Sequence, residues 1–341
     1  MAKIEASFNK TRLCLGKVLP LGTPLSVILD ISERCNFKCN YCFRSKKKDG
    51  AWGYTAKNNL MSMELFQRAA SQMSAFPQKI KVISLSGHGE PLCNPEIAAM
   101  ARYLGECSIT ERIEMHTNAS LLTEKTAREI AQAGFSRIVV SLQGLDSLTY
   151  ERVCGARLDW DNFYKCLQIL YKSKNDELKI HVKISEAALS AENRTAEEER
   201  FYALFGPIAD TVSVEKVTPL WKNLEFESKE AVNKYGQDIG MVECCPILFY
   251  KMWVAPDGEI YPCTGLPAPI SLGNIQDTTL SEAWNGKKRR KFLISHLREP
   301  RGGCAECADC FVPVNTVATE EDRIDPYREE IAARLEEYSY E

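Results

Sequence analysis

Three cysteines, Cys35, Cys39 and Cys42, stand within one short segment near the start of the chain. Structural zinc sites usually take their ligands as two CxxC pairs, and a disulfide framework does not crowd cysteines into one loop. Three thiolates on a short loop suit a cubane iron–sulfur cluster in which one iron has no protein ligand. Such an open position distinguishes a reactive metal site from a closed structural one. A zinc loop with a distant fourth ligand is the alternative.

A second group of cysteines lies in the last third of the chain and comprises Cys244, Cys245, Cys263, Cys304, Cys307 and Cys310. Two largely apolar runs, at residues 247–254 and 259–261, flank an Asp-Gly pair, and this pattern predicts a β-hairpin. The hairpin would bring Cys245 and Cys263 together. Four thiolates close a metal site, and both a structural zinc ribbon and an iron–sulfur cluster use such a set. The residues alone leave these two alternatives open.

The composition is that of an ordinary globular chain with many thiols. Of its 341 residues, 45% are hydrophobic and 26% are charged, enough to fill a core and cover its surface. The net charge of −3 gives no reason to expect nucleic acid as a partner. Residues 1–22 lack the apolar core of a signal peptide, and no run is long enough to span a membrane. Because 14 cysteines without a secretion signal favour a reducing compartment, we expect a cytoplasmic protein without membrane contact.

Strand-like and helix-like segments alternate from residue 26 to residue 217. We expect six strands, at residues 26–31, 80–85, 112–117, 137–142, 178–184 and 211–217. Helices are expected between them, for example at 63–74 behind a Ser62 cap, at 124–133 behind Thr123 and at 162–171 behind Asp161. Such alternation predicts a parallel sheet wound right-handed. Because six units are too few for a closed eightfold barrel, the predicted fold class is α/β with an open, partial (β/α)6 barrel.

The polar side chains of these strands predict a ligand cavity. In the fifth strand Ile180 and Val182 alternate with His181 and Lys183, and the sixth strand places Glu215 on its polar face. Apolar faces should pack on the outer helices, which leaves the polar faces inside the barrel. A purely structural barrel would be filled with branched aliphatic side chains instead. We therefore expect His181, Lys183 and Glu215 to contact substrate or act as a catalytic base, the alternative being that they satisfy one another or bind a cofactor.

Four unusual loops follow the first four expected strands. The cysteine loop follows the first, residues 86–91 (Ser-Gly-His-Gly-Glu-Pro) follow the second, residues 116–119 end the third, and residues 141–144 end the fourth. Ligands of parallel α/β sheets bind at the carboxyl ends of the strands. A glycine-rich loop alone marks little more than a turn. Its position beside the cysteines, at matching strand ends, indicates one shared binding site.

The CxxxCx(aromatic)C pattern of Cys35, Cys39, Tyr41 and Cys42 resembles the signature of the radical S-adenosylmethionine superfamily. The resemblance covers roughly residues 25–218. It implies a [4Fe-4S] cluster on the three cysteines, whose fourth iron is chelated by the amino and carboxylate groups of S-adenosylmethionine. The implied reaction cleaves S-adenosylmethionine reductively to methionine and a 5′-deoxyadenosyl radical, which abstracts a hydrogen atom from the substrate. The protein would supply orientation and a dry cavity.

Seven further positions match residues that bind the cofactor in this superfamily. They are Tyr41, Gly87, Gly89, Glu90, Asn118, Ser141 and Arg152. The segment from Gly87 to Glu90 resembles the GGEP segment that binds the amino group of S-adenosylmethionine, with His88 where glycine is commoner. Glycines let the backbone approach a ligand closely, and Glu90 would accept hydrogen bonds from the ammonium.

The other matches concern the adenosine and the methionyl carboxylate. By this resemblance, Tyr41 would lie against the adenine, Ser141 would reach the ribose or the carboxylate, and Arg152 would pair with the methionyl carboxylate. Asn118 matches the asparagine of a TNG segment, although Ala119 replaces its glycine.

The second cysteine group resembles the SPASM/twitch extension of radical S-adenosylmethionine enzymes, down to residues 272–275 (Leu-Gly-Asn-Ile) and 282–285 (Glu-Ala-Trp-Asn). A full SPASM domain carries seven cysteines for two auxiliary clusters, whereas this segment has six and none after Cys310. The resemblance therefore implies one auxiliary [4Fe-4S] cluster. Its expected ligands are Cys245, Cys263, Cys307 and Cys310. Cys304 competes with one of the last two, and Cys244 is expected to be a bystander.

These features divide the chain into five expected parts. They are an N-terminal extension at residues 1–24, the radical S-adenosylmethionine partial barrel at 25–218, a linker at 219–240, an auxiliary cluster domain of hairpin and helix at 241–312, and a C-terminal helical tail at 313–341. The tail has the pattern of an amphipathic helix that turns Ile331, Leu335 and Tyr338 toward the body.

Only 34 residues precede Cys35, too few for the leader-binding domain that many peptide-modifying relatives carry. A small domain with one auxiliary cluster more closely resembles the butirosin-pathway alcohol dehydrogenase. We therefore expect an oxidoreductase that abstracts a hydrogen atom from a small polyhydroxylated, sugar-like substrate, with a reductant such as flavodoxin or ferredoxin as partner. One alternative is a maturase that forms a crosslink, thioether or epimer on a ribosomal peptide. The other is a non-catalytic metal-bound scaffold or electron carrier.

Overall fold

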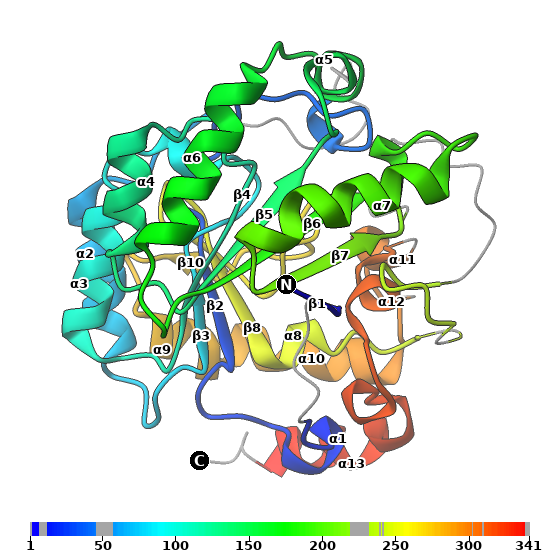
Figure 1. The fold of residues 1–341 in the computed structure, drawn as a ribbon. Coiled ribbons are helices and arrows are strands. Elements are labelled where there is room, and N and C mark those ends of the chain that lie inside the picture. Colours follow the sequence, from blue (N-terminus) through cyan, green and yellow to red (C-terminus); the bar gives the residue numbers. More distant parts are fainter. Residues whose placement is uncertain are drawn as a thin grey trace.

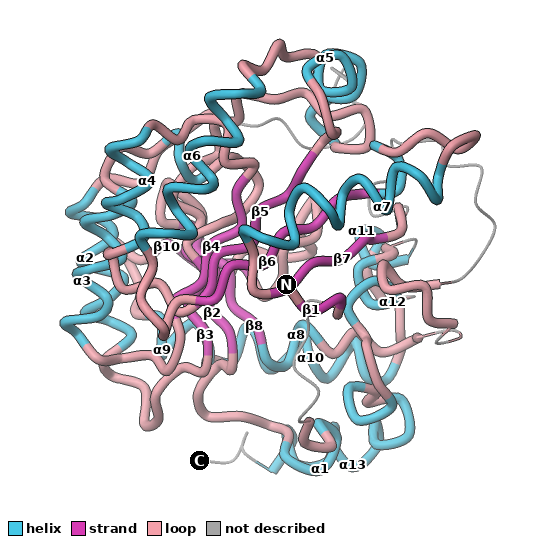
Figure 2. Tube along the Cα trace, viewed as in Figure 1, coloured by secondary structure: helices cyan, strands magenta, loops and turns pink. Residues whose placement is uncertain are grey.

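Ten strands form one sheet at the centre of the molecule, and most of the helices surround its outer face (Figure 1, Figure 2). The structure, a computed structural model, describes residues 2–6, 12–45, 57–218, 232–238, 240, 242–301, 303–308 and 310–337. Most of the expected linker at 219–240, and Tyr338 of the expected tail, lie outside the described residues.

The six expected strands are present and parallel. They are β2 (Ser26–Leu29), β3 (Val82–Ser84), β4 (Ile113–Thr117), β5 (Arg137–Leu142), β6 (Lys179–Ser185) and β7 (Thr211–Glu215). Each pairs with the next along the chain, and the register of β5 and β6 sets Ser141 beside Lys183. The sheet does not close on itself, because β1 and β10 stand at its two ends. The predicted α/β partial barrel is confirmed.

Four further strands extend the sheet at its two edges. They are β1 (Lys3–Ile4), β8 (Lys251–Val254), β9 (Glu259–Tyr261) and β10 (Gly273–Asn274). β1 pairs in parallel with β7, and β8 pairs in parallel with β2, while β9 and β10 continue the sheet antiparallel. The hairpin of the second cysteine segment is therefore an edge of the barrel sheet.

The first strand of this hairpin is shorter than the sequence predicts. Residues 247–254 were expected to be extended, but Ile247–Tyr250 form a helical turn, α8, and β8 begins only at Lys251. Pro246 stands before the turn with φ −69° and ψ −25°, which are helical values. Because its ring fixes φ near this value, proline favours the start of a helix and turns the following residues into it.

Helices cover the outer face of the parallel strands (Figure 1). They are α2 (Met63–Met73), α3 (Ile97–Cys107), α4 (Glu124–Ala131), α6 (Trp160–Ser173) and α7 (Arg194–Phe205), while α5 (Ser147–Cys154) lies beyond the end of β5. Ser62 and Thr123 cap α2 and α4 as predicted, because each accepts a hydrogen bond from the backbone N–H three residues on. The predicted cap of α6 was wrong. Asp159 has the extended backbone that a cap needs and accepts from Asn162, whereas Asp161 lies within the first turn.

The remaining helices belong to the terminal parts of the chain. They are α1 (Leu15–Val18), α8 (Ile247–Tyr250), α9 (Leu280–Asn285), α10 (Lys287–Arg298), α11 (Ala305–Ala308), α12 (Val312–Thr316) and α13 (Arg328–Glu337). Ile331 and Leu335 of α13 are buried in a small second core together with Leu15 of α1 and Leu293 of α10. Among the described helices, none has both the length and the apolar character needed to cross a membrane.

The alternation of side chains along the strands separates a core from a cavity. Ile138, Val140 and Leu142 of β5 are at most 1% exposed and belong to the main core under the helices. Their neighbour Ser141 and the paired Lys183 line a cavity on the other face. The barrel interior is therefore polar because the strands place one face on the helices and the other on the cavity.

The turn after β4 contains a backbone conformation that usually belongs to glycine. Ala119 has φ +60°, in the left-handed region, and it is 1% exposed. A residue with a Cβ pays about 1–2 kcal/mol for this conformation. The turn is thus kept although alanine replaces glycine.

We expect Ala119→Gly to raise the free energy of unfolding by about 0.5–1 kcal/mol. Glycine removes the strain of the left-handed backbone, while the greater freedom of the unfolded chain offsets part of the gain. Urea unfolding of the two proteins measures the difference. The matched control is Ala127→Gly in helix α4, which should lose about 1 kcal/mol. A loss at both positions would show that Ala119 is not strained.

Candidate active site

The cysteine loop leaves the end of β2 and is fastened to helix α5. The backbone N–H of Lys38 donates to the carbonyl of Cys154 at 3.0 Å. Phe37 packs edge-on against Tyr150 of α5, with ring centroids 5.9 Å apart. Both contacts flank the thiols, so the loop has a fixed position at the end of α5.

Cys35, Cys39 and Cys42 are partly buried and influence one another. Burial raises the pKa of Cys35 to about 11, and it also raises the pKa of Cys42. The pKa of Cys39 is raised by its hydrogen bond with the Cys154 thiol, by burial and by the charge of Cys42. A bound metal ion reverses this preference, because thiolates are stabilised by the cation. The donor set therefore suits an iron–sulfur site.

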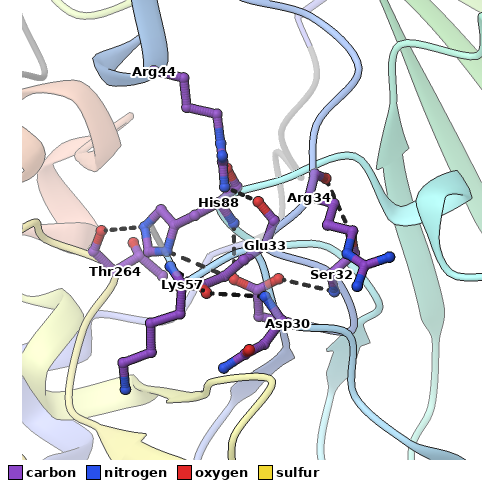
Figure 3. Close-up of polar contacts among 9 residues, drawn as sticks. Asp30, Ser32, Glu33, Arg34, Arg44, Lys57, His88 and Thr264 are labelled. Atoms are coloured by element: carbon purple, nitrogen blue, oxygen red, sulfur yellow. Dashed lines mark hydrogen bonds and ion pairs between the residues drawn. The ribbon is translucent and has the colours of Figure 1, made fainter. Parts of the chain in front are cut away.

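The glycine loop after β3 packs against a buried carboxylate, Asp30, at the end of β2 (Figure 3). Asp30 accepts hydrogen bonds from the backbone N–H groups of His88 at 2.9 Å and Ser32 at 3.3 Å. A Cβ on Gly87 would lie 2.0 Å from the Asp30 carboxyl carbon, and one on Gly89 would lie 2.2 Å from the Ser32 carbonyl oxygen. The protein's own packing thus requires both glycines.

Glu90 is buried, and its carboxylate accepts three hydrogen bonds from the protein. The donors are the Thr117 hydroxyl at 2.5 Å, the Asn118 N–H at 2.7 Å and the Leu92 N–H at 3.0 Å. Burial raises the pKa of Glu90 to about 7. We expected this carboxylate to accept hydrogen bonds from a ligand ammonium. In the structure Glu90 joins the glycine loop to the end of β4, and its contact with a ligand ammonium stays a prediction.

Asn118 links the end of β4 to the cysteine loop. Its amide group donates to the Asn36 side chain at 3.0 Å, and its oxygen accepts from the Ser120 hydroxyl at 2.7 Å. Asn36 also donates to the Ser120 hydroxyl at 2.7 Å. Because Asn36 directly follows Cys35, this network brings the predicted cofactor-binding asparagine next to the cysteine loop.

Tyr41 and Ser141 line one interior cavity together with Cys42 and Lys183. Ser141 and Lys183 also line an adjoining cavity, which reaches Gly87. The structure therefore brings three of the predicted cofactor-binding residues to one interior space beside the third cysteine.

Arg152 is not part of this arrangement. It lies on an exposed face of α5 and lines neither of the two cavities. Its pairing with a methionyl carboxylate stays a prediction.

Lys183 and Glu215 form an ion pair at the wall of the cavity. The Lys183 ammonium lies 2.6 Å from one carboxylate oxygen of Glu215, and the Lys234 ammonium lies 3.7 Å from the other. Burial opposes the charge of Glu215, but the two ammonium groups outweigh it and lower the pKa to about 2. Both of these predicted catalytic residues line the cavity with Lys234.

His181, the third predicted catalytic residue, is engaged elsewhere. Its Nδ1 lies 2.7 Å from the Thr211 hydroxyl, and its Nε2 lies 3.1 Å from the Ser213 hydroxyl. Burial is the main cause that lowers its pKa to about 3. Because both ring nitrogens have partners and the side chain is 1% exposed, His181 supports the strands and has no nitrogen directed at a substrate.

The four expected ligands of the second site line a single cavity. They are Cys245, Cys263, Cys307 and Cys310. Burial raises the pKa of Cys263 to about 12. As at the first site, bound iron would favour the thiolates. Cys304 does not line this cavity, and its thiol lies 3.1 Å from the Glu306 carboxylate. Cys244 is buried outside the same cavity.

No three His, Cys, Asp or Glu side chains in the described ranges converge closely enough to hold one metal ion. Cysteines that hold a cubane cluster do not need to converge in this way, because each binds a different iron. Four thiols spread around one cavity are compatible with such a cluster.

His88 contacts neighbours of both cysteine sites, and Figure 3 shows its contact with Thr264. Its Nε2 lies 3.0 Å from the Thr264 carbonyl, one residue after Cys263. Its ring meets Phe43, one residue after Cys42, with centroids 5.8 Å apart. Burial lowers its pKa to about 4, so the ring is neutral at physiological pH. The side chain that replaces the commoner glycine therefore bridges the two sites.

Sequence reasoning missed several residues that the structure places at the sites. Asp30 supports the glycine loop, and His296 accepts the backbone N–H of Cys245 at 2.8 Å. Lys234 and Lys251 line the interior cavities. Two of these residues could have been found from the sequence. Asp30 stands at the end of an apolar run, and His296 is one of only four histidines in the chain. Lysines far apart in sequence gave no signal before the strand order was known.

Two family models match the chain. The model described as the radical SAM superfamily matches residues 29–184. The SPASM model, described as an iron–sulfur cluster-binding domain, matches residues 244–311. Together they cover both cysteine sites.

Curated relatives named GTP 3′,8-cyclase are similar to the chain. One from Microcystis aeruginosa is 28% identical over 166 residues, which cover 48% of this chain and 49% of the relative. One from Staphylococcus aureus is 30% identical over 134 residues, which cover 39% of this chain and 38% of the relative. The match thus spans half or less of these relatives.

Solved structures share the fold at low sequence identity. Streptococcus suis SuiB bound to the precursor peptide SuiA has a TM-score of 0.59 and 19% identity, covering 79% of this chain and 66% of its own. The protein anSMEcpe with bound AdoMet has a TM-score of 0.55 and 16% identity, covering 93% and 97%. BtrN in complex with AdoMet and 2-DOIA has a TM-score of 0.53 and 18% identity, covering 87% and 96%.

The chain carries a radical S-adenosylmethionine domain and a SPASM iron–sulfur domain. Its cofactors are S-adenosylmethionine and [4Fe-4S] clusters. The residues present fit these groups. Three thiols on one loop, of which Cys42 lines a polar cavity, suit an open cubane, and four thiols around a second cavity suit a closed one. We assign Cys35, Cys39 and Cys42 to the first cluster and Cys245, Cys263, Cys307 and Cys310 to the second as a proposal.

Iron analysis of anaerobically reconstituted variants tests the ligand assignment. We expect about eight iron atoms in the wild type and about four in a Cys35/Cys39/Cys42→Ala triple variant. Cys307→Ala should also lose about half of the iron, whereas Cys304→Ala should keep all of it. A triple variant without iron would show that the second site holds no iron–sulfur cluster. If Cys304→Ala lost iron and Cys307→Ala kept it, Cys304 would be the ligand in place of Cys307.

The buried carboxyl of Asp30 predicts a pH dependence of stability. Its pKa is raised to about 7 in the folded protein, mainly by burial, from an ordinary value of 3.8. The folded state therefore holds this proton more tightly, and the stabilisation present at low pH is lost as the pH rises through 7. We expect wild type to lose about 1 kcal/mol more than Asp30→Asn between pH 6 and pH 8 in urea unfolding. Equal losses would show that Asp30 is already ionised at pH 6.

Proposed function

We propose that this radical S-adenosylmethionine enzyme removes a hydrogen atom from a small polyhydroxylated, sugar-like substrate in the barrel interior and thereby oxidises or rearranges it. The lining of the interior cavity carries the proposal, because it combines hydroxyl, amide, ammonium and carboxylate groups beside Cys42. The hydroxyl groups of a sugar both donate and accept hydrogen bonds, so they need such a mixture of partners.

The residues of the chain bind and orient the reactants. When bound, S-adenosylmethionine and its cluster supply the radical chemistry that removes the hydrogen atom. Lys183 donates hydrogen bonds to a substrate hydroxyl, and Glu215 holds the ammonium of Lys183 in place at 2.6 Å. Because the pKa of Glu215 is about 2, its carboxylate stays charged and is a weak base. Glu215 therefore serves to orient Lys183.

The proposal includes the partners and setting of the enzyme. A small-molecule substrate enters the cavity, and a reducing protein such as flavodoxin or ferredoxin delivers electrons. We place the enzyme in the cytoplasm, where the 14 cysteines of the chain stay reduced.

Modification of a ribosomal peptide is the second candidate. It is supported by the similarity in fold to SuiB, which was solved with a precursor peptide. The relatives named GTP 3′,8-cyclase match about half of their own length or less, so they support the cofactor-binding part of the proposal and leave the substrate open.

Product analysis tests the proposed reaction. We expect the reconstituted protein to form 5′-deoxyadenosine from S-adenosylmethionine under dithionite, and the Cys35/Cys39/Cys42→Ala variant to form none. With deuterium-labelled candidates, deuterium should enter 5′-deoxyadenosine from a polyhydroxylated compound. Transfer from a peptide alone would favour the maturase. A protein that forms no 5′-deoxyadenosine would be a scaffold or an electron carrier.

Substitution of Lys183 tests the role of the ion pair. Lys183→Met removes the hydrogen-bond donor at the cavity wall, so we expect deuterium transfer from the substrate to fall at least tenfold. The control is Lys125→Met, because the Lys125 side chain is 84% exposed on α4 and does not line the cavity. Equal rates in the two variants would exclude Lys183 from substrate binding.

A further inference from the structure

The second cysteine site adjoins the interior cavity that reaches Gly87, here called the inner cavity. Cys245 and Cys263 line the cavity of the second site. Lys251 lines the inner cavity together with Thr264, the residue that directly follows Cys263. One short stretch of chain therefore contributes to both cavities, with a proposed cluster ligand next to a residue of the substrate space.

The strand pairing explains why Lys251 lies beside the second site. Trp253 of β8 lies opposite Tyr261 of β9 in an antiparallel pair. Two residues further along this register, Cys263 comes opposite Lys251. Cys245 stands before the short helix α8, and Lys251 follows this helix directly. Lys251 is thus close to two of the proposed ligands.

The thiolates of the second site act on the Lys251 ammonium. Burial is the main cause that lowers the pKa of Lys251, and the charge of Lys234 adds to it, whereas the charges of Cys245 and Cys263 raise this pKa. The influence is mutual. Burial raises the pKa of Cys263 to about 12, and the charge of Lys251 opposes the increase. The ammonium and the thiolates therefore stabilise each other's charged forms.

The other charged side chains near the two cavities are arranged differently. Arg301 and Glu306 line the cavity of the second site and carry opposite charges. In the barrel interior the Lys183 ammonium lies 2.6 Å from the Glu215 carboxylate. Lys251 interacts instead with the thiolates of the second site, so its charge acts on the group that they would hold.

A positive charge beside an iron–sulfur cluster favours its reduction. Four thiolates outweigh the charge of the iron–sulfur core, so the site is anionic and becomes more so when it takes up an electron. A nearby ammonium stabilises the more negative state, and this effect is larger where the groups are screened from water. The charge and hydrogen bonds around the ligands therefore adjust the reduction potential of such a cluster.

The proposed oxidation requires an acceptor for one electron. Transfer of a hydrogen atom to the 5′-deoxyadenosyl radical breaks a C–H bond of the substrate and leaves a radical on the carbon that bears the hydroxyl group. The carbonyl group forms when the hydroxyl proton passes to water and one electron leaves. A second cluster closed by four thiolates does not bind S-adenosylmethionine, so it can accept this electron and be reduced by one electron.

We propose that the Lys251 ammonium raises the reduction potential of the second cluster and thereby adapts this cluster to accept the electron from the substrate. This inference rests on the proposed function, because it names the residue that fits the second site to an oxidation. Lys251 acts through its charge on the cluster and does not itself react.

Redox titration of the reconstituted enzyme, followed by electron paramagnetic resonance, tests the inference without a substrate. The Cys35/Cys39/Cys42→Ala variant identifies the signal of the second cluster. In Lys251→Met and Lys251→Gln we expect the equilibrium constant for reduction of this cluster to fall at least tenfold, which is about 59 mV for one electron. Lys251→Arg keeps the charge and should titrate like wild type.

The matched control is Lys183→Met, which removes another lysine of the barrel interior. Because Lys183 is paired with Glu215, we expect the second cluster of this variant to keep the wild-type potential. Iron content of each variant shows whether both clusters are present.

Four outcomes would overturn the inference. The first is a second-cluster potential that Lys251→Met and Lys251→Gln leave unchanged. The second is an equal fall in Lys183→Met, and the third is an equal fall in Lys251→Arg, because the charge at this position would then not be the cause. The fourth is loss of about half of the iron from both uncharged variants, which would show that Lys251 holds the cluster in place.

These measurements separate the inference from the proposed function. If wild type transfers deuterium from a polyhydroxylated compound while the potential does not depend on Lys251, the inference fails and the proposed function stands. If the potential depends on Lys251 but deuterium comes only from a peptide, the proposed function fails and the effect of Lys251 on the cluster stands.

Discussion

The parallel pairing of β8 with β2 is the constraint on which the rest of the structure depends. Ser26 to Leu29 lie beside Lys251 to Val254, which follow more than two hundred residues later in the chain. The cysteine loop begins directly after β2, while Cys245 precedes β8 and Cys263 follows its hairpin partner β9. One strand pairing thus brings the two groups of cysteines to neighbouring parts of one sheet, with His88 in contact with residues next to both. It also carries Lys251 into the barrel interior.

Buried polar groups then fix the loops around the first site. Asp30 accepts a hydrogen bond from the backbone N–H of His88 in the glycine loop. Glu90 joins this loop to the end of β4 by accepting a hydrogen bond from the Asn118 N–H. Asn118 ties β4 to the cysteine loop through Asn36. Each bond is buried or partly buried, where an unmade hydrogen bond is costly, so the loops support one another. The residues that match cofactor-binding positions in the superfamily therefore serve in part to shape the site, and the cavity they surround is lined by Tyr41 and Ser141.

Local chemistry made much of this arrangement readable from the sequence. The six strands, the caps at Ser62 and Thr123 and the polar inner face follow from side-chain period and hydrogen-bonding groups close together in the chain. Contacts between distant segments did not follow. Three features depend on packing that no local pattern encodes. They are the edge pairing of β8, the hydrogen bond from Thr117 to Glu90 and the exposed position of Arg152. Residues 247–250 are a different case, because Pro246 stands in the sequence directly before them and favours the start of a helix.

We propose that the chain holds two distinct [4Fe-4S] clusters, one open to S-adenosylmethionine and one closed by four thiolates. Electron paramagnetic resonance of the dithionite-reduced wild type, before and after addition of S-adenosylmethionine, tests this most directly. We expect two cluster signals, of which only one changes when S-adenosylmethionine is added. A single cluster signal, or two signals that both change, would contradict it.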